Sequence, residues 1–299
     1  MLQSRPAPQH PLVSVAMVVY DPHPEFFRKA VESIVCQRFT DWELIIVEDP
    51  SPHSAVNTLQ AIQDPRIRYF LNPHRTSLIE QRNRAFHEAR GQFIALMDGD
   101  DIAHPFRLIK QINFLRSHPA VDVVGSQIDV IDSDDRICGY RWFPSLHDEI
   151  QKSIVMTVPL CQPAVMLRRD VVDRLGGYQL TEFPAGEDYE YWSRLIQAGV
   201  RFANLPEVLL YYRVHPLQLK NSKLRETIRA VLCVRDRYWS DRVGFRARLQ
   251  IGGERIWLYL PKRLVAWLLL KIRWHYRSCP SAPRVWPTIG AREFIEAKT

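Results

Sequence analysis

The chain has 299 residues, of which 46% are hydrophobic and 24% are charged. These proportions are typical of folded globular proteins and exclude a mainly disordered chain, and the length favours one large domain with a smaller appendage. The net charge of +7 arises in residues 240–299, which hold 12 Lys and Arg against 4 Asp and Glu, whereas residues 1–239 hold 28 against 29. Because the larger part has no basic excess, we expect no nucleic-acid partner.

Apolar runs alternate with amphipathic segments in the N-terminal third of the chain. Residues 12–19 (LVSVAMVV) form a β-branched run that is typical of a strand buried on both faces. Residues 25–37 carry apolar side chains at helical spacing, which predicts an amphipathic helix. The same patterns predict, in chain order, a strand at 42–47, a helix near 55–63, a strand at 67–71, a helix near 78–89 and a strand at 92–97. Strands that alternate with helices indicate an α/β fold with a mostly parallel sheet.

The pattern is less regular after a further helix expected at 104–118. Strands are expected at 121–131, 162–167 and 207–214, and their irregular spacing favours a mixed sheet in this part. The composition changes after about Pro216. We therefore expect one α/β domain over residues 1–217 and a helical, basic, aromatic-rich region over residues 218–299.

Acidic side chains follow the strand expected at 92–97, in the run Asp98-Gly99-Asp100-Asp101. Ligands of parallel sheets bind beyond the carboxyl ends of the strands. Carboxylates that share one tight turn repel one another unless a cation lies between them, and hard oxygen ligands suit Mg²⁺ or Mn²⁺. A solvated turn or a helix cap would use the same residue types, but the position directly after a buried strand favours a metal site.

A second acidic motif, Gly186-Glu187-Asp188, precedes apolar residues at helical spacing and is expected to open a helix. One explanation is that these carboxylates cap free N–H groups and oppose the helix dipole. The other is that they belong to a functional site. The residues alone leave both explanations open.

Seven segments carry a family resemblance. In order they are VSVAMVVYD, SIVCQRFTDWELIIVED, EQRNRAFHEARGQFIALMDGDD, HPFRLIKQINFLRSHPAVDVVGS, PAVMLRRDVVDRLGGY, GEDYEYWSRLIQAG and LPEVLLYYRVHP, and they span residues 12–216. This set resembles glycosyltransferase family 2, whose members are inverting enzymes with the α/β GT-A fold. The resemblance implies that fold for residues 1–217.

The resemblance also implies a binding site for a nucleotide sugar. The residues expected to contact its base, ribose, phosphates or sugar are Tyr20, Asp21, Asp49, Arg82, Asn83, Asp98 and Glu187. The run Glu48-Asp49-Pro50 departs from the family's usual pair of aspartates before a Gly-Ser-Thr-like turn, and its proline stiffens the backbone. The sequence therefore leaves the base of the donor open.

A metal ion and a catalytic base are implied as well. The expected metal ligands are Asp98, Asp100, Asp101 and His215, with Mn²⁺ or Mg²⁺ as the cofactor. A histidine in the position of His215 can instead form a hydrogen bond without binding a metal. Asp188 matches the family's base. Transfer with inversion needs a carboxylate to take the acceptor's proton on one face of the sugar, while a cation offsets the charge of the diphosphate that leaves from the other.

We therefore expect an inverting glycosyltransferase that uses a nucleotide-diphosphate donor, with a UDP-sugar favoured. The expected acceptor is saccharide or lipid-linked, in cell-surface polysaccharide or glycolipid assembly. A catalytically silent scaffold that uses the basic tail is one alternative, and a nucleotidyltransferase is another. The latter needs a glycine-rich loop after its first strand, where this chain has Tyr20-Asp21-Pro22-His23-Pro24.

Residues 256–276 (IWLYLPKRLVAWLLLKIRWHY) are basic and rich in aromatic side chains. Their uninterrupted apolar run, 264–270, is shorter than the roughly 20 residues that span a bilayer. The segment either contacts an anionic membrane surface or packs against protein. Because no apolar run precedes residue 12 and the cysteines are scattered, we expect a cytoplasmic protein, either free or peripheral on the cytoplasmic face of the membrane.

Overall fold

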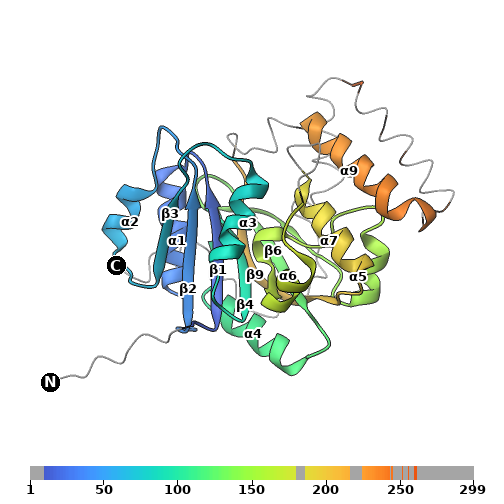
Figure 1. Cartoon of the computed structure of the whole chain (residues 1–299), viewed down its shortest axis with the longest axis horizontal. Helices are drawn as coiled ribbons and strands as arrows, with labels where there is room; N and C mark the ends of the chain where they lie inside the picture. The colour runs from blue at the N-terminus through green and yellow to red at the C-terminus, as the bar shows by residue number, and fades with distance from the viewer. Residues whose placement is uncertain are drawn as a thin grey trace.

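The computed structural model describes residues 10–179, 186–215, 224–242, 244, 251, 255, 259 and 260. A twisted sheet with helices on both of its faces forms the centre of this part of the chain (Figure 1). The α/β fold expected from the sequence is therefore confirmed.

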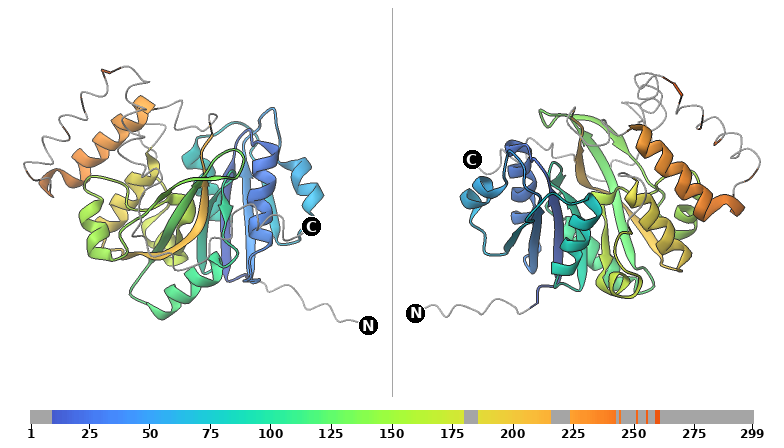
Figure 2. Two further views of the ribbon diagram at one scale, coloured as in Figure 1. Left: turned by 180° about the vertical axis from the view of Figure 1, so that it is seen from behind. Right: turned by 45° about the horizontal axis from the view of Figure 1, so that its top comes forward.

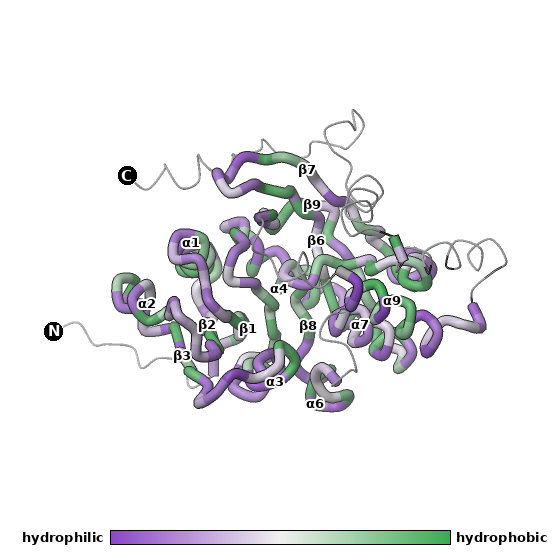
Figure 3. The backbone as a smooth tube through the Cα atoms, turned by 90° about the horizontal axis from the view of Figure 1, so that it is seen from above, coloured by the Kyte–Doolittle hydropathy of each residue, from purple (hydrophilic) through white to green (hydrophobic). Residues whose placement is uncertain are grey.

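The first half of the sheet is parallel. Its strands are β1 (Val13–Val19), β2 (Trp42–Glu48), β3 (Ile67–Leu71) and β4 (Phe93–Asp98), in the spatial order β3-β2-β1-β4. The helices between them are α1 (Pro24–Val35), α2 (Val56–Ile62) and α3 (Leu78–Glu88). Figure 3 shows α1 and α3 on opposite sides of β1 and β2, which explains why these strands are apolar on both faces. Their carboxyl ends meet at one edge of the sheet.

The second half of the sheet is mixed, as expected. Its elements are β5 (Ile102–Ala103), α4 (Arg107–Ser117), β6 (Val123–Ile131), β7 (Ile137–Arg141), α5 (His147–Ser153), the 3₁₀ turn η1 (Gln162–Ala164), β8 (Met166–Arg168), α6 (Arg169–Leu175), α7 (Glu187–Gln197) and β9 (Phe202–Arg213). The path continues β4-β8-β6-β9-β5, with β7 paired to β6. Here β6 and β9 are parallel, whereas β8 is antiparallel to β4 and β6, and β5 is antiparallel to β9.

Two of the expected strands differ in their bounds. Residues 162–164 form a 3₁₀ turn, because Pro163 lacks the N–H that a strand pairing would use, and the strand begins only at Met166. The last strand begins at Phe202, ahead of the expected residue 207, because Phe202 and Ala203 already pair with Val123 and Val124.

Two hydrophobic clusters cover the two faces of the sheet. One includes Met17 of β1 and Leu108 of α4. The other includes Phe86 of α3, Trp192 of α7 and Trp239 of α9 (Leu224–Trp239), which the 3₁₀ turn η2 (Ser240–Arg242) follows. Both views in Figure 2 show α9 beside α7. The first described helix beyond residue 217 thus shares a core with the sheet, and the boundary expected there stays a prediction.

Within the described residues, no helix has the length and apolar content that crossing a membrane requires. The cysteines in this part of the chain form no disulfide. The basic, aromatic segment 256–276 lies outside the described residues except for Tyr259 and Leu260. Its contact with a membrane or with protein therefore stays a prediction.

Candidate active site

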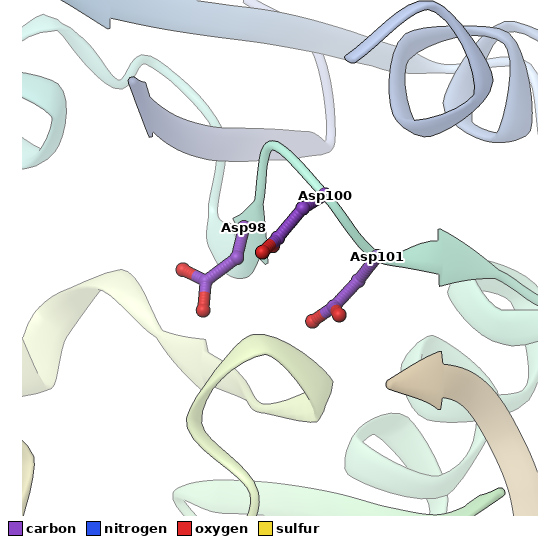
Figure 4. Close-up of side chains that lie close together, drawn as sticks. All are labelled: Asp98, Asp100 and Asp101. Atoms are coloured by element: carbon purple, nitrogen blue, oxygen red, sulfur yellow. The ribbon is translucent and has the colours of Figure 1, made fainter. Parts of the chain in front are cut away.

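The acidic turn after β4 gathers its carboxylates at the edge where the parallel strands end. Asp98, Asp100 and Asp101 each offer an oxygen within 4.8 Å of the others, and Figure 4 shows all three side chains directed to the same side of the turn. Asp101 is fully buried, and the other two are part-exposed. Gly99 lets the turn lie against β1, since a Cβ there would come within 2.7 Å of Val19 Cγ1. The chain thus concentrates negative charge at one point.

This group fits a divalent cation by its chemistry and spacing. Carboxylate oxygens are the ligands that Mg²⁺ and Mn²⁺ prefer, and such sites leave positions for phosphate oxygens. His215, just after β9, lies outside this three-residue set, but its Nε2 is 3.0 Å from Oδ2 of Asp100. The structure therefore places all four expected metal ligands together, and whether His215 binds a metal or orients Asp100 stays a prediction.

Arg82 connects the two acidic motifs. It lies on α3, whose N-terminus is stabilised by a reciprocal capping box between Ser77 and Glu80. Its Nη2 is 3.7 Å from Oδ1 of Asp98 and 3.6 Å from Oε1 of Glu187, the first residue of α7. Segments far apart in the sequence therefore converge on one guanidinium.

The surroundings of Arg82 are unusual for a largely buried cation, 11% of whose side chain is exposed. Its Nε is buried and makes no hydrogen bond within the described part of the chain. Burial lowers the pKa of Arg82, but the nearby charges of Glu187, Asp98 and Asp188 outweigh that effect and raise it above its usual value. An unsatisfied buried N–H is costly, and among these residues the side chain of Arg82 has an incomplete set of hydrogen bonds.

Asp188 is the second residue of α7 and is half-buried. Its Oδ1 accepts a hydrogen bond of 2.7 Å from the N–H of Tyr189, so it does serve the start of the helix. Its charge also acts on Arg82 and raises the pKa of Glu187, for which burial is the larger cause. Asp188 therefore supports the start of the helix, as the capping explanation expects, and its charge also acts on the pair formed by Glu187 and Arg82.

The loop after β1 is tied to its neighbours by two basic residues that the sequence did not single out. Tyr20 is 41% exposed, and the guanidinium of Arg75 lies 3.9 Å from its ring centre and donates to its hydroxyl at 3.0 Å. Asp21, at φ 50°, accepts hydrogen bonds from the backbone N–H and Nδ1 of His53, and the ring bond lowers the pKa of Asp21. The contacts of His53 with Asp21 and of Arg75 with Tyr20 could be recognised only in the folded structure.

Two expected nucleotide contacts have internal partners. Asp49 is buried and accepts from Nδ2 of Asn72 at 2.6 Å and from the backbone N–H of Thr76 at 2.7 Å. Asn83 exchanges two hydrogen bonds of 2.8 Å with the backbone of Tyr178. These bonds give both residues a supporting role in holding loops, and their contact with a nucleotide stays a prediction.

The arrangement has clear relatives. The model of the family described as Glycosyl transferase family 2 matches residues 14–176. The chain is 31% identical over 206 residues to the amylovoran biosynthesis glycosyltransferase AmsE of Erwinia amylovora, and this match covers 68% of the chain and 76% of AmsE.

Two solved structures resemble the fold. One is S. aureus TarS 1–349 in complex with UDP-GlcNAc, with a TM-score of 0.59 and 17% identity, where the match covers 74% of this chain and 66% of the other. The second is the mannosyltransferase PcManGT from Pyrobaculum calidifontis in complex with GDP-Man and Mn²⁺, with a TM-score of 0.58 and 15% identity over 99% of this chain and 82% of the other. At these identities the similarity concerns the fold alone.

Proposed function

Because the chain belongs to glycosyltransferase family 2, we propose that it is an inverting, metal-dependent enzyme that transfers a sugar from a UDP-sugar to an acceptor hydroxyl. The observation that carries this proposal is Arg82, which brings the acidic turn and the start of α7 to one rim of the sheet. Asp98 of the candidate metal site and Glu187, the neighbour of the candidate base, thus lie on either side of one largely buried cation.

The donor and acceptor classes follow from the relatives and the site. The structural neighbours hold UDP-GlcNAc and GDP-Man, which supports a nucleotide-sugar donor. The proposed acceptor is saccharide or lipid-linked, in the assembly of a cell-surface polysaccharide or glycolipid. The relative AmsE, which is named for amylovoran biosynthesis, supports a biosynthetic role of this kind. Tyr20 and Asp21 would face the base and ribose.

The metal would be held by Asp98, Asp100 and Asp101, whose oxygens are mutually close enough to share one ion. Mn²⁺ or Mg²⁺ there would supply positive charge that offsets the charge of the departing diphosphate. His215 would complete the shell or hold Asp100 in place. The N–H groups of Arg82 would donate hydrogen bonds to the phosphate oxygens.

The protein's own carboxylates divide the remaining work. Asp188 takes the proton of the acceptor hydroxyl as the new bond forms between the acceptor oxygen and the anomeric carbon. The bond from that carbon to the diphosphate oxygen breaks on the opposite face, so the configuration inverts. Glu187 stays paired with Arg82 and keeps that cation beside the donor.

The test is Asp188→Asn, which keeps the shape of the side chain and removes the base. We expect turnover to fall by about 10²- to 10⁴-fold, as for other general bases, while donor affinity measured by calorimetry changes little. Released nucleoside diphosphate is measured with UDP-, GDP- and dTDP-sugars, Mn²⁺ and a set of saccharide and lipid-linked acceptors. NMR of the product tests inversion.

Asp173→Asn on α6 is the matched control, because the side chain of Asp173 is 61% exposed and, among the described residues, forms its ion pair along its own helix with Arg169. Full turnover in Asp188→Asn would remove Asp188 as the base. A wild-type protein that is inert with every donor would instead favour a silent scaffold.

A further inference from the structure

Arg213, the last residue of β9, forms hydrogen bonds with the acidic turn. Its backbone N–H donates to Oδ1 of Asp101 at 2.8 Å, and its Nε donates to the backbone oxygen of Asp100 at 2.8 Å. The side chain is fully buried, and its guanidinium lies 4.4 Å from the ring centre of Phe26 on α1. A single residue therefore fixes both the backbone of Asp100 and the carboxylate of Asp101.

The other side of the same guanidinium is held by the turn between β6 and β7. Nη1 donates to the backbone oxygen of Asp132 at 2.9 Å, and Nη2 is 2.6 Å from Oδ1 of Asp135. The second oxygen of Asp135 accepts from Nζ of Lys29, on α1, at 2.6 Å. Both ends of this second ion pair are largely buried, with 14% of Lys29 and 7% of Asp135 exposed.

A buried guanidinium is stable only when its charge is paired, and Asp135 supplies the opposite charge as an ion pair. The planar fork of arginine also fixes the directions of its hydrogen bonds, which a lysine cannot do. The position of Arg213 therefore depends on Asp135, and the position of Asp135 depends on Lys29. Residues that contact metal ligands without binding the metal orient those ligands in this way.

We propose that Lys29, Asp135 and Arg213 form a positioning relay that sets Asp100 and Asp101 for a divalent cation. The relay runs from α1 through the β6–β7 turn to the end of β9 and then to the acidic turn. It rests on the metal dependence in the proposed function, and it assigns no chemical step to its members.

A simple field effect makes a different prediction. If only charge mattered, removal of the positive Lys29 would leave more negative charge near the site, so a cation would bind more tightly or equally well. If position matters, removal of Lys29 releases Asp135 and Arg213, and the cation binds more weakly. The direction of the change in Lys29→Met therefore separates the two mechanisms.

Mn²⁺ binding to the full chain, without donor, is measured by the EPR signal of free Mn²⁺. We expect Lys29→Met and Asp135→Asn each to raise the Kd for Mn²⁺ roughly tenfold, the lower end of the effect found when supports of metal ligands are removed. Asn suits the φ of 63° at Asp135 without strain. Arg213→Lys keeps the charge, loses the fork, and should weaken binding as well.

Asp134→Asn is the control in the same turn, since Asp134 is 68% exposed and pairs with the exposed Arg136. It should leave the Kd unchanged. Circular dichroism confirms that each variant is folded, and if Asp135→Asn does not fold, Lys29→Met and Arg213→Lys decide. An unchanged or lower Kd in Lys29→Met overturns the relay alone, whereas wild-type protein that binds no Mn²⁺ overturns both the relay and the metal dependence.

Discussion

Within the part of the chain that the structure describes, Arg82 has two charged partners but an incomplete set of hydrogen bonds. Its distances to Asp98 and Glu187, 3.7 and 3.6 Å, are long for hydrogen-bonded ion pairs, and its Nε has no hydrogen-bond partner within the described residues. The two ion pairs therefore balance the charge of Arg82 without giving its Nε a hydrogen-bond acceptor. A phosphate oxygen, which accepts several N–H groups at once, would satisfy this N–H without displacing either carboxylate.

Asp129 is a residue whose charge opposes folding. It lies on β6, across from Tyr211 of β9 and Tyr140 of β7, and burial raises its pKa to about 6 from an ordinary 3.8. Because the folded state prefers the protonated acid, ionised Asp129 destabilises the fold. The penalty is absent below the unfolded pKa, grows as the pH rises between the two values, and is complete above about 6.

We expect Asp129→Asn, which is neutral at every pH, to raise the free energy of unfolding at pH 8 by up to about 3 kcal/mol, since one pKa unit corresponds to about 1.4 kcal/mol. At pH 5 the gain should be about half as large. Urea unfolding at both pH values measures it, with Asp134→Asn as the control. A gain that is equal at both pH values would show that the charge of Asp129 is not its cause.

At the scale of elements, the start of α7 depends on a close approach by α9. Gly186 has φ +84°, and a Cβ added there would lie 2.9 Å from Cβ of Ala230. Gly199, at the other end of α7, has φ +82° with nothing within 4 Å of such a Cβ. The two glycines share a backbone conformation and differ in whether α9 touches them.

We therefore expect Gly199→Ala to cost only the strain of the left-handed conformation, about 1–2 kcal/mol. Gly186→Ala should cost more and should also lower turnover, because the contact displaces Glu187 and Asp188. Adding Ala230→Gly to it should restore part of both losses by removing the contact alone. Thermal unfolding and turnover are measured side by side, and equal effects of the two glycine substitutions would show that α9 does not position the start of α7.

The elements that the sequence predicted well are those whose signal is local. Strands β1, β2 and β4 are continuous apolar runs, and their burial on both faces follows from that pattern. The early start of β9 could not be predicted because it depends on the pairing of Phe202 and Ala203 with Val123 and Val124 of β6, which no local pattern of residues encodes.

The candidate site divides in the same way. The acidic turn and the Glu187-Asp188 pair could be found from their place after a strand and before a helix. The partners of Asp49 and Asn83 could not, because Thr76 and Tyr178 reach them only in the folded chain. The hydrogen bonds from Arg213 to Asp100 and Asp101 could not be predicted for the same reason.

At the scale of the whole molecule, the core does not end where the composition changes. Trp239 of α9 is fully buried, and its Nε1 donates to Oγ of Ser193 on α7 at 3.0 Å. The hydroxyl of Tyr238 donates to Oε1 of Glu190 at 2.7 Å, so α9 also supplies a hydrogen bond to a buried carboxylate of α7. The helix that carries the candidate base is therefore covered on its outer side by residues beyond 217.

We expect a chain that ends after residue 217 to lose cooperative folding, whereas one that ends after residue 242 keeps α9 and should fold. Loss of a single buried Trp typically costs about 3–5 kcal/mol, and whole domains are stable by only about 5–15 kcal/mol. Removal of α9 takes away Trp239 and several more buried side chains, so little stability would remain. Urea unfolding of both truncated chains and the full chain measures this, and an equal midpoint for the 1–217 chain would instead establish the boundary that the composition predicts.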